Sequence, residues 1–104
     1  MEKGQVIYEV SLMIDEDILT EFQYWLTTHI KEMLTFPGFI KANILRPENE
    51  KLLGKEKLTI QYQLKDSLSL EHYFEQYADQ MRNKGIARFK DKFSAQRRIF
   101  LCVN

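Results

Sequence analysis

Four stretches of the chain have the pattern of β-strands, which are rich in β-branched and aromatic residues or alternate between apolar and polar positions. These stretches are residues 5–14, 39–46, 57–64 and 94–103. In the first stretch both alternating faces are partly apolar, which predicts a central strand that is covered on both sides. The third stretch alternates cleanly, which predicts one buried and one polar face.

Apolar residues recur every three or four positions in other parts of the chain, as they do on the buried side of an amphipathic helix. The predicted helices are residues 15–34 and 67–85, and residues 86–93 form a shorter third candidate. Asp15 and Ser67 are the expected N-caps, because their side chains can accept a hydrogen bond from the first helical turn. Gly85 is the expected stop of the second helix. Pro37 and Gly38 fit the central positions of a type II turn after the first helix.

The predicted elements follow one another as strand, helix, strand, strand, helix and strand. This βαββαβ order is that of a ferredoxin-like fold of the α+β class, with one four-stranded antiparallel sheet and both main helices on one face. Right-handed crossovers place strands 5–14 and 57–64 in the centre of the sheet. With 104 residues, no internal repeat and no linker, the chain is expected to form a single domain over residues 1–104.

One face of the predicted sheet packs against the helices, and its residues are Tyr8, Val10, Leu12, Ile60 and Tyr62. The opposite face is mixed; it carries Ile7, Met13, and Ile40 or Phe39, beside Glu9, Thr59, Gln61 and Gln63. An RNA-recognition motif would display stacking aromatic residues on this face, and the third strand has none there. We therefore expect the open face to form a homodimer by sheet-on-sheet packing, with no nucleic acid as a partner.

The formal net charge is zero, because 15 basic residues balance 15 acidic ones. No general attraction to nucleic acid or to an anionic membrane is expected. Residues 82–98 differ, with seven basic residues and one acidic residue. This segment is either a solvated rim balanced by acids elsewhere in the fold, or a patch for an anion or an acidic partner. The same alternatives, an anionic ligand or ion pairs with Glu9, Asp66 or Asp91, hold for Arg46, Arg88, Arg97 and Arg98.

The single cysteine, Cys102, argues against an internal disulfide and against a cysteine-based zinc site. No apolar run reaches the roughly 18 residues that a membrane span needs. Residues 1–10 lack the long apolar stretch of a secretory signal. We therefore expect a cytoplasmic protein that does not bind a membrane.

Two segments resemble a known family. The first, WLTTHIKEMLTFPGFIKANILR, contributes Trp25, Leu26, His29, Glu32, Met33, Leu34, Pro37, Gly38 and Phe39. The second contributes Met81, Arg82, Gly85, Phe89, Phe93 and Arg98. Together with the order of elements, they resemble a small bacterial family of domains of unknown function within the dimeric α+β barrel superfamily, which also contains antibiotic-biosynthesis-monooxygenase-like proteins. The resemblance implies a symmetric dimer with a pocket between sheet and helices in each subunit.

The resemblance also implies a range of chemistries for that pocket: cofactor-free oxygenation, haem degradation, lactone isomerisation or haem binding. An oxygenating or haem-degrading member is expected to carry an Asn on the first strand, together with a Trp and a His. Here Tyr8 and Glu9 occupy the middle of the first strand, and Trp25 and His29 lie one turn apart on the same helix. The triad is not reproduced, and we expect no cofactor.

His29 lies on the apolar side of the first predicted helix and is the candidate catalytic residue. An imidazole can act as an acid or a base near neutral pH. Alternatively, His29 is a structural residue that is bonded to a backbone carbonyl, to Glu32, or to a tyrosine such as Tyr8 or Tyr62. His29 and Glu32 would supply only two metal ligands, so no metal site is expected.

The predicted ligand pocket is aromatic and comprises Tyr8, Trp25, His29, Tyr62 and Tyr77, with Tyr73 as a further candidate. The same spacing also fits an ordinary helix core. The leading hypothesis is a homodimer without catalytic machinery that binds a small apolar molecule or a protein partner. The alternative is a cofactor-independent monooxygenase or isomerase that acts on a small organic molecule with His29 as acid or base. A cavity of a few hundred Å³ beside the imidazole would favour this alternative.

Overall fold

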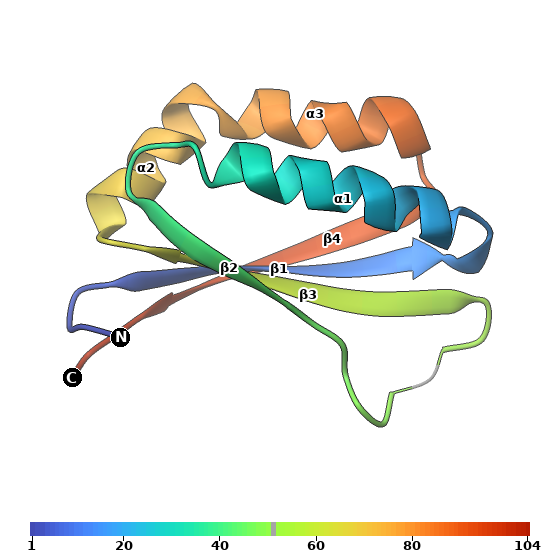
Figure 1. Cartoon of the computed structure of the whole chain (residues 1–104), viewed down its shortest axis with the longest axis horizontal. Helices are drawn as coiled ribbons and strands as arrows, with labels where there is room; N and C mark the ends of the chain where they lie inside the picture. The colour runs from blue at the N-terminus through green and yellow to red at the C-terminus, as the bar shows by residue number, and fades with distance from the viewer. Residues whose placement is uncertain (51) are drawn as a thin grey trace.

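The computed structural model describes residues 1–50 and 52–104, and these residues form one four-stranded sheet with three α-helices on one of its faces (Figure 1). The strands are β1 (Val6–Asp15), β2 (Phe39–Leu45), β3 (Lys55–Leu64) and β4 (Phe93–Leu101). The helices are α1 (Leu19–Met33), α2 (Ser67–Gln76) and α3 (Ala78–Phe89), with a short 3-10 helix η1 (Glu16–Ile18) before α1.

All strand pairs are antiparallel, and the strand order is β2-β3-β1-β4. The predicted central position of β1 and β3 is thereby confirmed, and so is the ferredoxin-like α+β fold. Figure 1 shows α1 and α3 lying along the sheet, while α2 covers one end of it. The two chain termini lie at the same end, where the Gly4 N–H donates to the Cys102 carbonyl at 2.9 Å.

The second helical region differs from the prediction, because it breaks in the middle. Tyr77 has φ −131° and ψ −24°, which separates α2 from α3. Gly85 does not end a helix; it is buried inside α3, and a Cβ there would lie 3.0 Å from the Trp25 ring and 3.2 Å from the Phe93 ring. The residue is glycine because two aromatic rings press against the helix at this point. Residues 86–93 do not form a separate helix, since α3 continues to Phe89. Lys90 follows as the C-cap and, with a φ of 56°, ends the helix.

The predicted helix caps are also corrected. Asp66, and not Ser67, caps α2: its carboxylate accepts from the Ser69 N–H at 2.8 Å and from the Ser69 hydroxyl at 2.7 Å. Asp15 does stand before the first helical turn, but its side chain makes no capping hydrogen bond. Instead, the first turn is the 3-10 helix η1.

The turn between α1 and β2 forms as expected. The Phe39 N–H donates to the Phe36 carbonyl at 3.2 Å, and Gly38 has φ 86°. A type II turn requires such a positive φ at its third position, which glycine adopts without strain. The turn directs Phe39 toward the helices, where its ring packs against Tyr62 and Tyr73. The sequence predicted either Ile40 or Phe39 on the open face. The prediction is wrong for Phe39, whereas Ile40 is 47% exposed.

The core lies between the sheet and the helices. α1 buries Phe22, Leu26, Ile30 and Met33, and the sheet contributes Tyr8, Leu12, Ile60 and Tyr62 from the predicted face. Tyrosine hydroxyls and one histidine are mixed into this layer, so polar atoms stand inside an otherwise apolar interior.

The other face of the sheet has no helix over it in the described chain and carries a row of polar contacts. Glu9 is only 5% exposed, because it accepts hydrogen bonds from Gln61 at 3.0 Å and from Arg98 at 2.9 Å. The Gln61 bond, followed by the bond to Arg98 and its charge, lowers the pKa of Glu9 although burial opposes this shift. Ser11 and Thr59 pair in the next row at 3.3 Å. The polar groups of Glu9, Gln61 and Arg98, and of Ser11 and Thr59, are thus paired within the chain on the open face.

Candidate functional site

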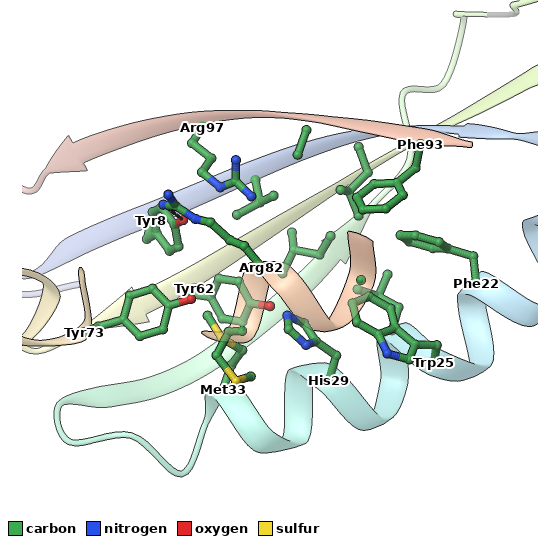
Figure 2. Close-up of a pocket in the computed structure, with 17 residues that line it drawn as sticks. Tyr8, Phe22, Trp25, His29, Met33, Tyr62, Tyr73, Arg82, Phe93 and Arg97 are labelled. Carbon is green, nitrogen blue, oxygen red and sulfur yellow. Dashed lines mark hydrogen bonds between the residues drawn. The ribbon is translucent and has the colours of Figure 1, made fainter. Parts of the chain in front are cut away.

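A cavity of about 60 Å³ lies between the inner face of the sheet and helices α1 and α3 (Figure 2). Its apolar lining includes Phe22, Leu26, Met33, Ile60 and Phe93. Four of the predicted pocket residues, Tyr8, Trp25, His29 and Tyr62, border it, and so does Tyr73. The cavity therefore brings together residues from β1, α1, β3, α2, α3 and β4 that are far apart in the sequence.

Tyr77 does not line this cavity. Its ring stacks on Phe36, with centroids 4.3 Å apart and an interplanar angle of 15°. The pair lies beside the turn that follows α1, and Tyr77 is the residue at which α2 ends. Tyr77 therefore packs against Phe36 and is not among the residues that line the cavity.

His29 projects from α1 beside the cavity, and its ring stacks on Trp25 at a centroid distance of 4.5 Å and an interplanar angle of 20°. Its Nδ1 atom is buried and has no hydrogen-bond partner among the described residues. Among the described residues this nitrogen has none of the partners that the structural alternative named, which were a backbone carbonyl, Glu32 and a tyrosine. Glu32 instead accepts from the Lys84 ammonium at 2.8 Å, because α3 places Lys84 next to α1.

Burial lowers the pKa of His29 from 6.5 to about 4, although the nearby charge of Glu32 works in the opposite direction. The imidazole is therefore neutral at neutral pH. In this form one ring nitrogen donates and the other accepts a hydrogen bond. A neutral imidazole with a free nitrogen can accept a proton or orient a polar group of a bound molecule.

Three tyrosines surround the other end of the cavity. Tyr8 stacks against Tyr62 with centroids 6.1 Å apart and tilts against Tyr73 at 5.9 Å. Burial raises the pKa of Tyr62 and of Tyr73, so their hydroxyls stay protonated and can donate hydrogen bonds. The Tyr8 hydroxyl is occupied, since it accepts from Nη2 of Arg82 at 3.2 Å.

Two arginines at the cavity were not among the predicted pocket residues. Arg82 projects from α3 and Arg97 from β4, and both guanidinium groups border the cavity (Figure 2). The Nε atom of Arg82 is buried and has no hydrogen-bond partner among the described residues. Arg97 shares the helix-facing parity of Phe93 and Ala95, as the pairing with β1 shows. That parity could have identified Arg97 from the sequence. Arg82 stands four residues after Ala78 and three before Gly85, so the helical spacing could have placed it on the buried side of α3.

The other basic residues of segment 82–98 mostly have acidic partners. Lys84 pairs with Glu32, Lys92 pairs with Asp17 at 2.6 Å, and Arg98 pairs with Glu9. Outside the segment, Arg46 pairs with Glu56 at 2.7 Å. The predicted rim of balanced charges accounts for these paired side chains. It does not account for Arg88 and Lys90, which are exposed, or for Arg82 and Arg97, which line the cavity.

Within residues 1–50 and 52–104 no group of three or more metal-binding side chains comes together. None of the helices formed by these residues has the length and the apolar character needed to cross a membrane.

The sequence matches a family profile, described as a domain of unknown function (DUF4286), over residues 5–103. The chain belongs to this family. The predicted resemblance to a family of unknown function is thereby confirmed. Among proteins with curated annotation, none matches the sequence.

Solved structures confirm the wider fold relationship. A cofactor-independent oxygenase, SnoaB from Streptomyces nogalater, superposes with a TM-score of 0.70 at 12% identity, over 96% of this chain and 95% of that one. A dimeric ferredoxin-like protein from an uncultured marine organism gives 0.71 at 18% identity, over 96% of each chain. A conserved protein from Methanosarcina mazei Go1 gives 0.65 at 18% identity, over 94% and 93% of the two chains. At these identities the likeness shows a shared fold.

Proposed function

We propose that this DUF4286 protein binds a small organic molecule in the cavity beside His29, and that it does so as a homodimer without catalysing a reaction. The observation that supports the binding role is the unpaired Nδ1 of His29 next to a cavity. Buried polar atoms are usually hydrogen-bonded, so the unpaired nitrogen of a residue that lines a cavity supports a polar group of a bound molecule as its partner, which a small shift of the lining side chains would let reach it.

The size of the cavity limits its occupant. Pockets for drug-sized molecules measure ~300–1,000 Å³, whereas this cavity measures about 60 Å³. An engineered cavity that accepts benzene is larger, at ~150 Å³. The proposed ligand is therefore a molecule of a few heavy atoms, or one that inserts a small group and leaves its remainder at the mouth.

Trp25 gives a direct test, because it is the single tryptophan of the chain and it borders the cavity. We would screen a library of small organic fragments and follow Trp25 fluorescence and the Trp25 indole resonance. Binding at the proposed site shifts both signals, and His29→Leu alters the response. His72→Leu is the matched control, because His72 is exposed and lies on α2. If no fragment moves the Trp25 signals, the binding proposal is wrong.

The homodimer is proposed through the open face of the sheet. Ile7 and Met13 stand on this face beside the paired polar groups of Glu9 and Gln61, so a second copy would cover apolar side chains without leaving these polar groups unpaired. A structural relative of the same fold is itself described as dimeric. Light scattering should give roughly twice the 12.5 kDa chain mass, and a monomer at all concentrations would contradict the proposal. The bacterial origin and the cytoplasmic location stay predictions of the sequence.

A second candidate function is a cofactor-independent monooxygenase or isomerase with His29 as the acid or base. The unpaired Nδ1 of a histidine that lines the cavity favours it, whereas the lowered pKa of His29 makes the imidazole a weaker base at neutral pH. One structure of the same fold is described as a cofactor-independent oxygenase. The test is oxygen consumption, or isomer formation, with a panel of small phenols and lactones. Activity that survives His29→Gln as well as it survives His72→Gln would exclude this function.

A further inference from the structure

The cavity has an electrostatic bias that its apolar walls do not reveal. Among the described residues that line it are two arginines, Arg82 and Arg97, and no Asp or Glu. An arginine remains positively charged at every relevant pH. Among the described residues, neither of the two guanidinium groups forms an ion pair, although Asp79 is close enough to act on Arg82 through its charge.

Contacts with neighbouring side chains fix the position of Arg82, but one of its N–H groups has no hydrogen-bond acceptor. Its Nη2 atom donates to the Tyr8 hydroxyl at 3.2 Å, and its guanidinium lies 5.8 Å from the centre of the Phe74 ring. These contacts orient the group, yet its buried Nε–H has no acceptor. A buried charged donor without an acceptor is costly, so an anionic oxygen placed at the Nε–H would be favoured strongly.

Arg97 stands at the more exposed side of the same cavity. The side chains of Phe93 and Ala95, on the same side of β4, also line the cavity. Arg97 is the next residue on this side of β4, so its charge lies where the apolar lining formed by Phe93 and Ala95 ends. Such an arrangement suits a ligand with an apolar part inside and an acidic group at the arginine end.

Two protonated tyrosine hydroxyls, of Tyr62 and Tyr73, border the same space and can donate to an anion as well. Figure 2 shows His29 between Tyr62 and Trp25, and the Trp25 ring stacks on the imidazole. The lining of the site therefore combines two positive charges and two hydroxyl donors with an uncharged imidazole and an apolar aromatic ring.

From this arrangement we propose that the ligand is a small organic carboxylic acid, whose carboxylate lies between Arg82 and Arg97 and whose apolar part points toward Trp25 and His29. The proposal rests on the proposed function and adds the chemical class of the ligand. Carboxylates match the planar donor groups of arginine in shape and charge. A cavity of about 60 Å³ has room for a carboxylate with a short carbon chain, since one enclosed water needs only ~10–15 Å³.

The test compares each acid with its uncharged amide. Acetate and acetamide, and butyrate and butyramide, are titrated into the chain of residues 1–104 near neutral pH at constant ionic strength. Trp25 fluorescence and the imidazole resonances of His29 and His72 report binding. We expect at least one acid to bind about tenfold tighter than its amide, as the loss of a charge-assisted hydrogen bond implies.

Three variants test whether the preference for an acid over its amide comes from Arg82 and Arg97. Arg97→Gln is the main variant, because Arg97 is exposed and its loss leaves the core intact. Arg82→Gln is the second variant, with circular dichroism to verify folding, since Arg82 also supports Tyr8. Arg88→Gln is the matched control, because Arg88 is an exposed arginine of α3 outside the cavity lining. The acid preference should disappear in Arg97→Gln and persist in Arg88→Gln.

The outcomes separate this proposal from the proposed function. If amides bind as tightly as acids and shift the Trp25 signals, the cavity binds ligands and the acid proposal is wrong. If an acid binds better but Arg97→Gln behaves like Arg88→Gln, the assignment to this arginine pair is overturned. If neither acids nor amides shift Trp25 or His29, the acid proposal is wrong, and the fragment screen then decides whether the cavity binds anything.

Discussion

Acid should destabilise this protein through one side chain, His29, well before its carboxylates are protonated. In the folded state burial lowers the pKa of His29 from 6.5 to about 4. In the unfolded chain the same imidazole is in water and has a pKa of about 6.5. Between these two values the unfolded chain binds a proton that the folded protein does not bind. The free energy of unfolding therefore falls as the pH falls through this window.

The size of the effect follows from the two pKa values. The stabilisation is fully present above pH 6.5, and it is lost progressively until the pH reaches about 4. Each unit corresponds to ~1.4 kcal/mol, so His29 accounts for about 3 kcal/mol over the whole window and about 2 kcal/mol between pH 6.5 and 5. These values are upper bounds, because any opening that lets water reach the ring raises the folded pKa.

Urea unfolding, followed by far-UV circular dichroism at one protein concentration, measures this loss between pH 7 and 5. His29→Gln cannot be protonated, so its free energy of unfolding should change much less over this range. His72→Gln is the control and should keep the wild-type dependence. Hydrogen bonds from Gln61 and Ser69 also lower the pKa values of the Glu9 and Asp66 carboxyl groups below their ordinary range, so these groups contribute only at lower pH. An imidazole resonance of His29 that titrates near pH 6.5 would refute the reasoning.

Two further substitutions test the turn after α1 and the open face. Gly38→Ala should lower the free energy of unfolding by about 3 kcal/mol in urea titrations, because φ is 86° and the new Cβ would overlap a serine side chain of α2. Gly54→Ala, at φ 75° with open space around it, should cost only about 1 kcal/mol; equal losses would contradict the packing argument. Arg98→Glu places a second carboxylate beside Glu9 and should reduce the mass in light scattering to that of one chain. Lys84→Glu, on the helix side, should leave the dimer intact, and a dimer in both variants would exclude the open face as the interface.

The sheet topology could be predicted because each strand carries its own signal. The alternation along β1 and β3 specifies which residues face the helices, and the observed register keeps Tyr8 opposite Tyr62 on that face. The turn at Pro37 and Gly38 was equally local, since the two residue types nearly define its geometry. These features depend on residues that are neighbours in sequence or in period.

The errors came from contacts between elements. Gly85 looks like a helix stop in sequence, but the Trp25 and Phe93 rings pack against it within α3. Ser67 looks like a cap, but Asp66 takes that role by bonding Ser69. Such outcomes depend on which side chains the fold brings together, and a linear pattern does not contain this information.

The candidate site divides in the same way. The sequence by itself determined the strand and helix order, the apolar side of α1 and the placement of His29 and Trp25 one turn apart on it, because periodicity reports which residues share a face. Only the tertiary structure decided that Glu32 pairs with Lys84 and leaves His29 free, and that Arg82 and Arg97 meet at one cavity. The reason is physical: ion pairs and unpaired donors arise where separate elements meet, and their distances are set by the packing of the whole domain.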